Sequence, residues 1–266
     1  MTIDQFRALL ANTDLFVYER SVDQAENTVA ALVRRGLEKR LAVAGERADA
    51  FVGSEENGLK LCPLTNENAK ALMALFPYTK PASHKGHQFT MGFGDRLGLA
   101  TPGHIRALGD HDIYPVLAQQ SIRELNLTHR TFADVISAAA FNVFQEGYRK
   151  GYGADGDHLK TKDEIQYALE SGCTMVTLDC SEQIHQQAVT FPQEGIDALY
   201  TALPEAVRAH YEGVYLDKDL PVIGTLSAEE LRRIVIVFVS RSMSSYRIAQ
   251  ASDRRIGPKA HSRTQM

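Results

Sequence analysis

One stretch of the chain, residues 151–161, reads GYGADGDHLKT and decides the fold that the sequence predicts. Two carboxylates, an imidazole and an ammonium group crowd into it, between glycine-rich backbone and an expected helix start at residues 161–164. The segment closes a short strand and opens a helix, which is where α/β proteins hold their active sites. For this segment taken alone, a solvated polar loop is the alternative interpretation.

The same order of strand, polar loop and helix is expected on both sides of this stretch. Strands are predicted at residues 88–94, 113–118 and 174–182, and helices at residues 105–108, 135–148 and 163–171. Each strand of a parallel sheet needs a crossover to reach its neighbour, so four such units predict a parallel sheet. Polar residues gathered at the strand ends favour a (β/α) barrel over a doubly wound sheet.

The length of the chain limits how much of a barrel is expected. A complete (β/α)8 barrel takes about 250 residues, so one that begins near residue 88 would run well past Met266. We therefore expect an α/β fold in which residues 81–239 form an incomplete barrel, the N-terminal half of a (β/α)8 TIM-like barrel. A small α+β region over residues 1–80 is expected to precede it.

The N-terminal region and the tail have different sequence patterns. Apolar spacing between Ser21 and Gly36 predicts a helix, and a second helix is expected to begin near Thr65. Residues 240–266 contain six Lys or Arg against one Asp, a charge of +5, which leaves −9 for the rest of this −4 chain. A basic, Ser-rich segment without periodicity is typical of a disordered or non-native tail.

The composition excludes some classes of function. The chain has 266 residues, 44% of them hydrophobic, and a formal net charge of −4. This acidic balance argues against a general nucleic-acid binder, which would have a basic stripe. No basic segment followed by an apolar run opens the chain, and no stretch is apolar enough to span a bilayer. We expect a cytoplasmic enzyme that binds neither nucleic acid nor membrane; its three cysteines are expected to be reduced thiols.

Asp157 and His158 are the leading candidates for chemistry. An imidazole beside a carboxylate suits a divalent-metal ligand next to a general base. Adjacent residues of a regular strand point to opposite faces. Both side chains can therefore serve one site only if the strand ends before them, which Gly153 and Gly156 would permit.

Other charged residues lie near the expected strand ends. Arg96 could hold a substrate carboxylate through two parallel hydrogen bonds, although an ion pair with Asp95 or a neighbouring acid is equally expected. Lys160 could neutralise a developing oxyanion or be a solvated charge. Asp179 and Glu182 end the next strand and could support the site or bind a metal. Three weaker candidates, each more often structural, are His104, His185 and Gln119.

Four segments together resemble the tagaturonate epimerase family: residues 92–105, 115–125, 151–161 and 177–182. The resemblance implies a metal-dependent enzyme that interconverts the hexuronates D-tagaturonate and D-fructuronate in bacterial hexuronate breakdown. It implies that Asp157 is the proton acceptor, that His158 binds a divalent metal cation, and that the remaining ligands and the partner acid lie in the family's C-terminal half. The sequence departs from the family pattern after about Val237.

Other functions stay open at this stage. A metal-dependent aldolase or sugar isomerase on the same barrel would need the same base, metal and carboxylate clamp. Half a barrel could also be an inactive fragment or a weak binding module for sugar acids. Because it would leave an edge strand and an apolar face uncovered, it could form a homo-oligomer.

Overall fold

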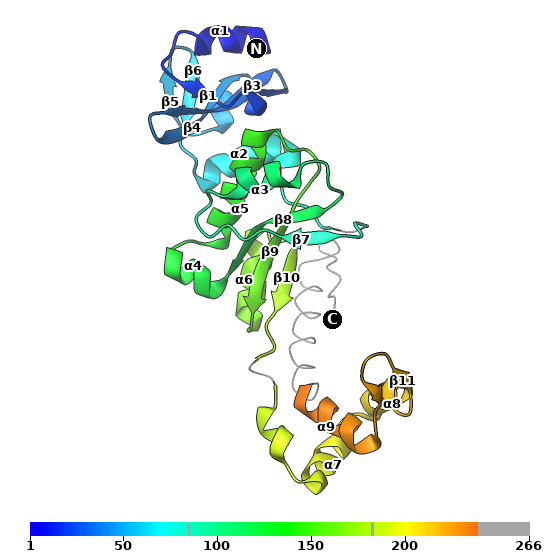
Figure 1. Cartoon of the computed structure of the whole chain (residues 1–266). Helices are drawn as coiled ribbons and strands as arrows, with labels where there is room; N and C mark the ends of the chain where they lie inside the picture. The colour runs from blue at the N-terminus through cyan, green and yellow to red at the C-terminus, as the bar shows by residue number, and fades with distance from the viewer. Residues whose placement is uncertain (85, 182–183, 239–266) are drawn as a thin grey trace. The chain divides into compact units, whose positions relative to one another are not determined.

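The protein is described from a computed structural model, which covers residues 1–84, 86–181 and 184–238. These residues divide into two compact units. The first contains residues 1–159 and 163–177, and the second contains residues 160–162 and 178–238. Figure 1 labels the helices and strands of both units, and each unit is described by itself.

The first unit opens with helix α1 (Ile3–Leu10), which a capping box between Thr2 and Gln5 begins. An antiparallel sheet follows, with strand order β1-β3-β4-β6-β5 and β2 paired to β3. Its strands are β1 (Phe16–Val17), β2 (Asp23–Ala25), β3 (Thr28–Arg35), β4 (Glu38–Gly45), β5 (Ser54–Glu56) and β6 (Leu59–Cys62). The expected small α+β region is thus an antiparallel sheet with helices beside it.

The helix predicted between Ser21 and Gly36 is wrong, because this segment forms the β2–β3 hairpin. Glu26 and Asn27 both have positive φ values, 46° and 56°, which is the backbone of a tight hairpin turn. The run TVAALV of β3 is buried on both faces of the sheet, so its apolar residues show no alternation. A short apolar run of this kind cannot be assigned to helix or strand by periodicity.

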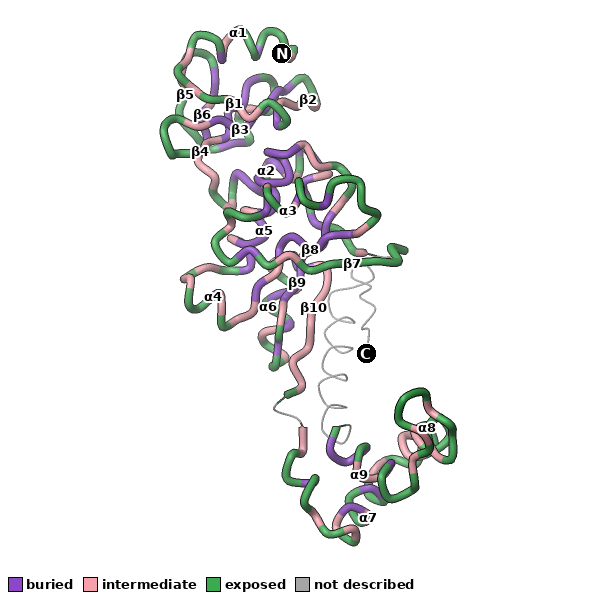
Figure 2. The backbone as a smooth tube through the Cα atoms, in the orientation of Figure 1, coloured by how far each residue is buried: buried purple, intermediate pink, exposed green. Residues whose placement is uncertain are grey.

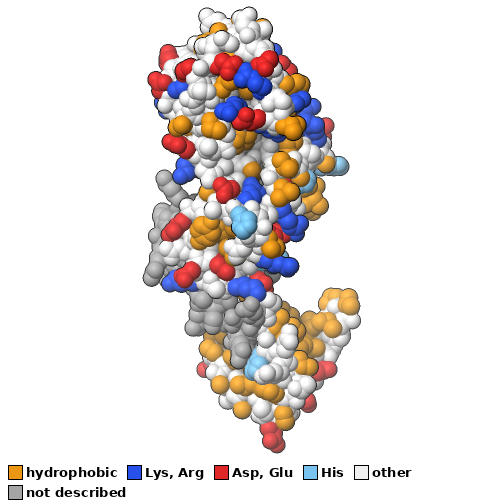
Figure 3. Space-filling model, turned by 90° about the vertical axis from the view of Figure 1, so that its left-hand side faces the viewer, with side chains coloured by type: hydrophobic (Ala, Val, Ile, Leu, Met, Phe, Trp, Pro, Cys, Tyr) orange, Lys and Arg blue, Asp and Glu red, His pale blue; other side chains and the backbone are white. Residues whose placement is uncertain are grey.

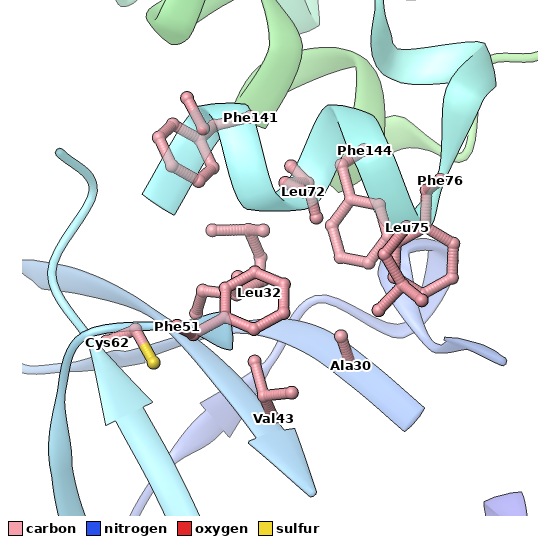
Figure 4. Close-up of a cluster of buried hydrophobic side chains, with 12 residues drawn as sticks. Ala30, Leu32, Val43, Phe51, Cys62, Leu72, Leu75, Phe76, Phe141 and Phe144 are labelled. Carbon is pink, nitrogen blue, oxygen red and sulfur yellow. The ribbon is translucent and has the colours of Figure 1, made fainter. Parts of the chain in front are cut away.

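Each face of the antiparallel sheet has its own core. On one face, Phe6 and Leu10 of α1 pack with alternate residues of β3 such as Ala31. On the other, Leu32 of β3 packs against α2 (Asn66–Leu75) and against aromatic side chains of α5 (Phe132–Glu146) (Figure 4). Four of the ten residues of α2 are buried, and Figure 2 shows buried positions along this helix. As predicted, α2 begins just after Thr65, which caps it.

A second, four-stranded sheet carries the predicted polar strand ends. Its strands lie in the order β10-β9-β8-β7, and the β7–β8 and β8–β9 pairs are parallel. They are β7 (Thr90–Gly92), β8 (Tyr114–Ser121), β9 (Gly153–Leu159) and β10 (Met175–Leu178), and the helices between them are α3 (Thr101–Leu108), α4 (Ile122–Thr128), α5 and α6 (Lys162–Ser171). The predicted α/β class with parallel strands is confirmed.

Helix α5 joins the two sheets of the first unit. Thr131 and Asp134 form its N-terminal capping box, and 12 of its residues are buried, among them Phe141 and Phe144. It contacts α2 and β3 on one side and β8 on the other. A helix that is apolar all round is buried in a core, and α5 is buried between two sheets. The boundary expected near residue 80 stays a prediction.

The second unit is mainly helical. Its elements are α7 (Gln193–Thr201), α8 (Glu205–Tyr215), β11 (Asp219–Leu220), β12 (Gly224–Thr225) and α9 (Ala228–Phe238). Ile196 of α7 and Val235 of α9 lie in its core. Ser227 and Glu230 cap α9 reciprocally, as their spacing predicts. The basic segment 240–266 lies outside the described residues.

Two surface properties bear on the expected partners. None of the helices in the described ranges is long and apolar enough to cross a membrane. On the face that Figure 3 shows, Lys and Arg side chains are interspersed with Asp and Glu side chains. Neither sign of charge dominates that face.

Candidate active site

Three polar side chains from neighbouring strands meet in a row across the parallel sheet. Gln119 of β8 and Asp155 of β9 are register partners, and Gln119 Nε2 donates to Asp155 Oδ2 at 3.0 Å. The hydroxyl group of Thr177 on β10 donates to the same oxygen at 2.8 Å. Asp155 is 1% exposed, and its Oδ1 atom has no hydrogen-bond partner in the described part of the chain. The row therefore holds a buried and half-satisfied carboxyl group.

Asp157 lies on the same face as Asp155, because it is two residues further along β9. Gly156 between them faces α6, since a Cβ atom added there would lie 2.7 Å from Cβ of Ala168. The Asp157 side chain is 22% exposed. Its burial raises the pKa of Asp157; the charge of His158 opposes this and that of Glu124 adds to it. Asp157 is thus a stronger base than a free aspartate.

His158 reaches Asp157 in an unexpected way. The strand was expected to end before these residues, but β9 continues to Leu159. His158 instead has a left-handed backbone, with a φ of 54°, which interrupts the alternation of faces. Its Nε2 atom lies 3.8 Å from Asp157 Oδ2, and its side chain is 63% exposed. Strain of this kind is typical of functional sites. The predicted base and the predicted metal ligand are therefore brought together.

Arg96 lies in the loop after β7, which Asp95 organises. The Asp95 carboxylate accepts hydrogen bonds from the backbone N–H groups of residues 99–101 and from the Thr101 hydroxyl. Arg96 is largely exposed and forms an ion pair with Glu124. This is the alternative role expected for Arg96, an ion pair with an acid of this chain. Glu124 also belongs to the capping box of α4. Arg96 is thus held beside the helix that follows β8.

The other candidate residues lie partly in the first unit and partly in the second. In the second unit, Lys160 Nζ lies 3.8 Å from Asp179 Oδ2, and Asp179 Oδ1 accepts from the backbone N–H of Ser181. Glu182 lies outside the described residues. His104 and His185 pack against the rings of phenylalanines, Phe93 and Phe191, respectively.

The donor set for a metal is incomplete in the described part of the chain. Zinc and other divalent metals in proteins usually have three or more protein ligands. No group of three or more His, Cys, Asp or Glu residues in the described ranges could hold a metal ion. Asp157 and His158 provide one oxygen and one nitrogen donor, which is fewer than the three ligands that a metal usually has.

Two members of the site, Asp155 and Thr177, are not among the residues that the sequence singles out, and Gln119 is only a weak candidate there. The spacing of Asp155 and Asp157 was the available signal, because residues two apart on a strand share a face.

This arrangement is typical of one class of protein. Polar and titratable side chains at the carboxyl ends of parallel strands are where α/β enzymes bind and convert small molecules. The chain belongs to the tagaturonate epimerase family, whose sequence model, UxaE, matches residues 18–249. The resemblance found in the sequence is therefore confirmed.

Individual relatives agree with this assignment. The chain is 36% identical over 214 residues to a tagaturonate/fructuronate epimerase of Thermotoga maritima, covering 78% of this chain and 44% of that protein. It also matches the native crystal structure of the fructuronate-tagaturonate epimerase UxaE of Cohnella laeviribosi, with 42% identity and a TM-score of 0.84, over 96% of this chain and 53% of that one. A crystal structure of the same enzyme with two glycerols matches at 41% identity and a TM-score of 0.84, over 98% of this chain and 54% of that one. The chain thus spans about half the length of these relatives.

Proposed function

We propose that this chain serves the interconversion of D-tagaturonate and D-fructuronate by inversion at C4, in hexuronate catabolism and in the cytoplasm. The observation that carries the proposal is Asp157, a carboxyl group of raised pKa at the end of a parallel strand. The family and the names of the relatives, which are tagaturonate or fructuronate epimerases, support the substrate.

The structure of the substrate limits the chemistry. The ketone of these sugar acids is at C2 and the carboxylate at C6, so the C4 hydrogen is next to neither carbonyl. Direct removal of that hydrogen is therefore unfavourable. The C4 hydroxyl is β to the ketone, so a base that takes its proton can start a retro-aldol cleavage of C3–C4. Rotation and re-addition then invert C4.

Residues of this chain can be given roles in that reaction. Asp157 takes the proton from the C4 hydroxyl, as a general base with a pKa closer to neutrality than usual. Arg96 or Lys160 orients the C6 carboxylate. Arg96 would exchange its partner Glu124 for the substrate, and a guanidinium can pair with two carboxylate oxygens at once. Asp179 would hold Lys160 in place.

The same proposal extends to the fold. Strands β7 to β10 are adjacent in sequential order, without the reversal that marks the switch point of a doubly wound sheet. This order supports one half of a (β/α)8 barrel. Association into a homo-oligomer, which would cover the open edge of such a half, stays part of the proposal.

His158 is the residue that would hold a divalent cation. Its imidazole is exposed and lies beside Asp157, and a cation bound there would supply Lewis-acid stabilisation of negative charge on the ketose oxygens. We expect metal analysis after dialysis to find a divalent metal that His158→Ala loses and His111→Ala, an exposed control, retains. Equal metal content in both variants would contradict this role.

Isotope labelling tests the reaction itself. The chain is incubated with D-tagaturonate in D₂O, and the product is identified by nuclear magnetic resonance. We expect D-fructuronate without solvent deuterium at C4, because the retro-aldol path leaves that hydrogen in place. Deuterium at C4 would contradict the mechanism. Three-carbon cleavage products without the epimer would indicate an aldolase, and no turnover would contradict the proposed function.

A further inference from the structure

The cost of burying Asp155 calls for a functional explanation. Its side chain is almost fully buried, and one of its two oxygens has no hydrogen-bond partner in the described ranges. Burying a carboxyl group that is only partly hydrogen-bonded costs folding free energy, which a purely structural role would not require. Asp155 is therefore poorly explained as a stabilising residue. The proposed mechanism does not use it either.

The contacts of Asp155 determine the orientation of one amide. Oδ2 of Asp155 accepts from both the Thr177 hydroxyl and Gln119, so the group that Gln119 turns toward Asp155 is its NH₂. The amide oxygen of Gln119 then faces the opposite way, toward β7. Without Asp155, the two ends of the amide would be free to exchange places.

The neighbouring strand leaves room for that amide. Residue 92 of β7 is a glycine, and a Cβ atom there would lie 2.5 Å from Oε1 and 2.9 Å from Nε2 of Gln119, so the glycine makes room for the whole amide group. Thr177 on β10 holds Asp155 from the other side. Gly92 therefore gives the Gln119 amide its space, and Asp155, held by Thr177, sets its orientation.

This row lies next to the proposed base. Asp157 and Ser121 are register partners, two residues beyond Asp155 and Gln119 on the same strands and face. Two residues along a strand span about 6.6 Å. A six-carbon sugar acid whose C4 hydroxyl contacts Asp157 is long enough to place another of its hydroxyl groups at Gln119.

We propose that Gln119 binds the keto sugar acid by accepting a hydrogen bond from one of its hydroxyl groups, and that Asp155 is the positioning residue that orients the Gln119 amide. The inference rests on the proposed function. It adds a substrate-binding residue and the residue that orients it. Both lie on the strands themselves, whereas Arg96 lies in a loop.

Calorimetric titration of the full chain with D-tagaturonate tests the inference. Gln119→Leu is expected to weaken binding about tenfold, the effect of one hydrogen bond. Gln120→Leu is the matched control. Gln120 is next to Gln119 in β8, so its side chain points to the other face of the sheet, where its amide is buried without hydrogen-bond partners in the described residues. It should bind like the wild type.

Variants of Asp155 separate positioning from a structural role. Asp155→Leu should weaken binding as much as Gln119→Leu, and the double variant should be no weaker, because Asp155 acts through Gln119. Asp155→Asn keeps an acceptor oxygen and should restore most of the affinity. Asp155→Asn should melt close to the wild type, because its oxygen can still accept from Gln119 and Thr177.

Each other outcome contradicts a defined statement. If the wild type binds D-tagaturonate and Gln119→Leu binds it equally well, the inference is wrong but the proposed function is not affected. Additive losses in the double variant, or an Asp155→Asn variant that melts like the wild type but does not regain affinity, overturn the positioning role. No binding by the wild type overturns the proposed function and the inference with it.

Discussion

Asp157→Asn is expected to lower the rate of epimerisation by about 10²- to 10⁴-fold, the usual contribution of a general base. An amide of the same shape cannot take the proton from the C4 hydroxyl group. The backbone of β9 and its pairing with β8 do not depend on this side chain, so the fold should be retained. Turnover of D-tagaturonate and the melting temperature are measured on the same preparation.

The control for this variant is Asp112→Asn, which makes the same chemical change at an exposed position. It should have wild-type activity. An Asp157→Asn variant that retains more than about a tenth of the wild-type rate would show that another group is the base. In that case the proposed use of this carboxyl group would be wrong.

Phe144→Ala is expected to lower the free energy of unfolding by about 3–5 kcal/mol, the usual cost of removing a buried phenylalanine. Phe144 is fully buried in α5, and its ring lies 5.0 Å from that of Phe76 between ring centroids. The deletion would leave a cavity where α5 meets the antiparallel sheet. Urea unfolding measures the change as a shift in midpoint.

Phe89→Ala is the matched control, because this phenylalanine is 62% exposed. Its effect on the free energy of unfolding should stay within about 0.5 kcal/mol. If the two variants had equal midpoints, the core around α5 would not contribute to the stability of the first unit. If Phe144→Ala unfolded in two separate transitions, the antiparallel sheet would be an independent domain, as the predicted boundary near residue 80 implies.

Part of the candidate site could be predicted from short segments of sequence. Asp157 and His158 stand in a glycine-rich segment between a strand and a helix, and this pattern is complete within residues 151–161. The family resemblance has the same character, because it rests on a few contiguous motifs. Signals that extend over about ten residues are carried by the local chain and need no knowledge of the tertiary structure.

The contacts within the site were not predictable in this way. Asp155 is 36 residues from Gln119 and 22 from Thr177, and they meet only because the register of three strands aligns them. Similarly, Thr101 is the first residue of α3, and Asp95, which lies outside the helix, accepts hydrogen bonds from its backbone N–H and its hydroxyl group.

The sequence by itself determined the α/β class, the parallel strands with polar ends, the family and the position of the candidate base, Asp157. Only the tertiary structure decided that residues 21–36 form a hairpin and that His158 turns toward Asp157 through a left-handed backbone. It also decided which polar side chains share a face with the candidate base. The physical reason is that local propensity and periodicity act within one segment, whereas strand register and burial on two faces depend on residues far apart in the chain.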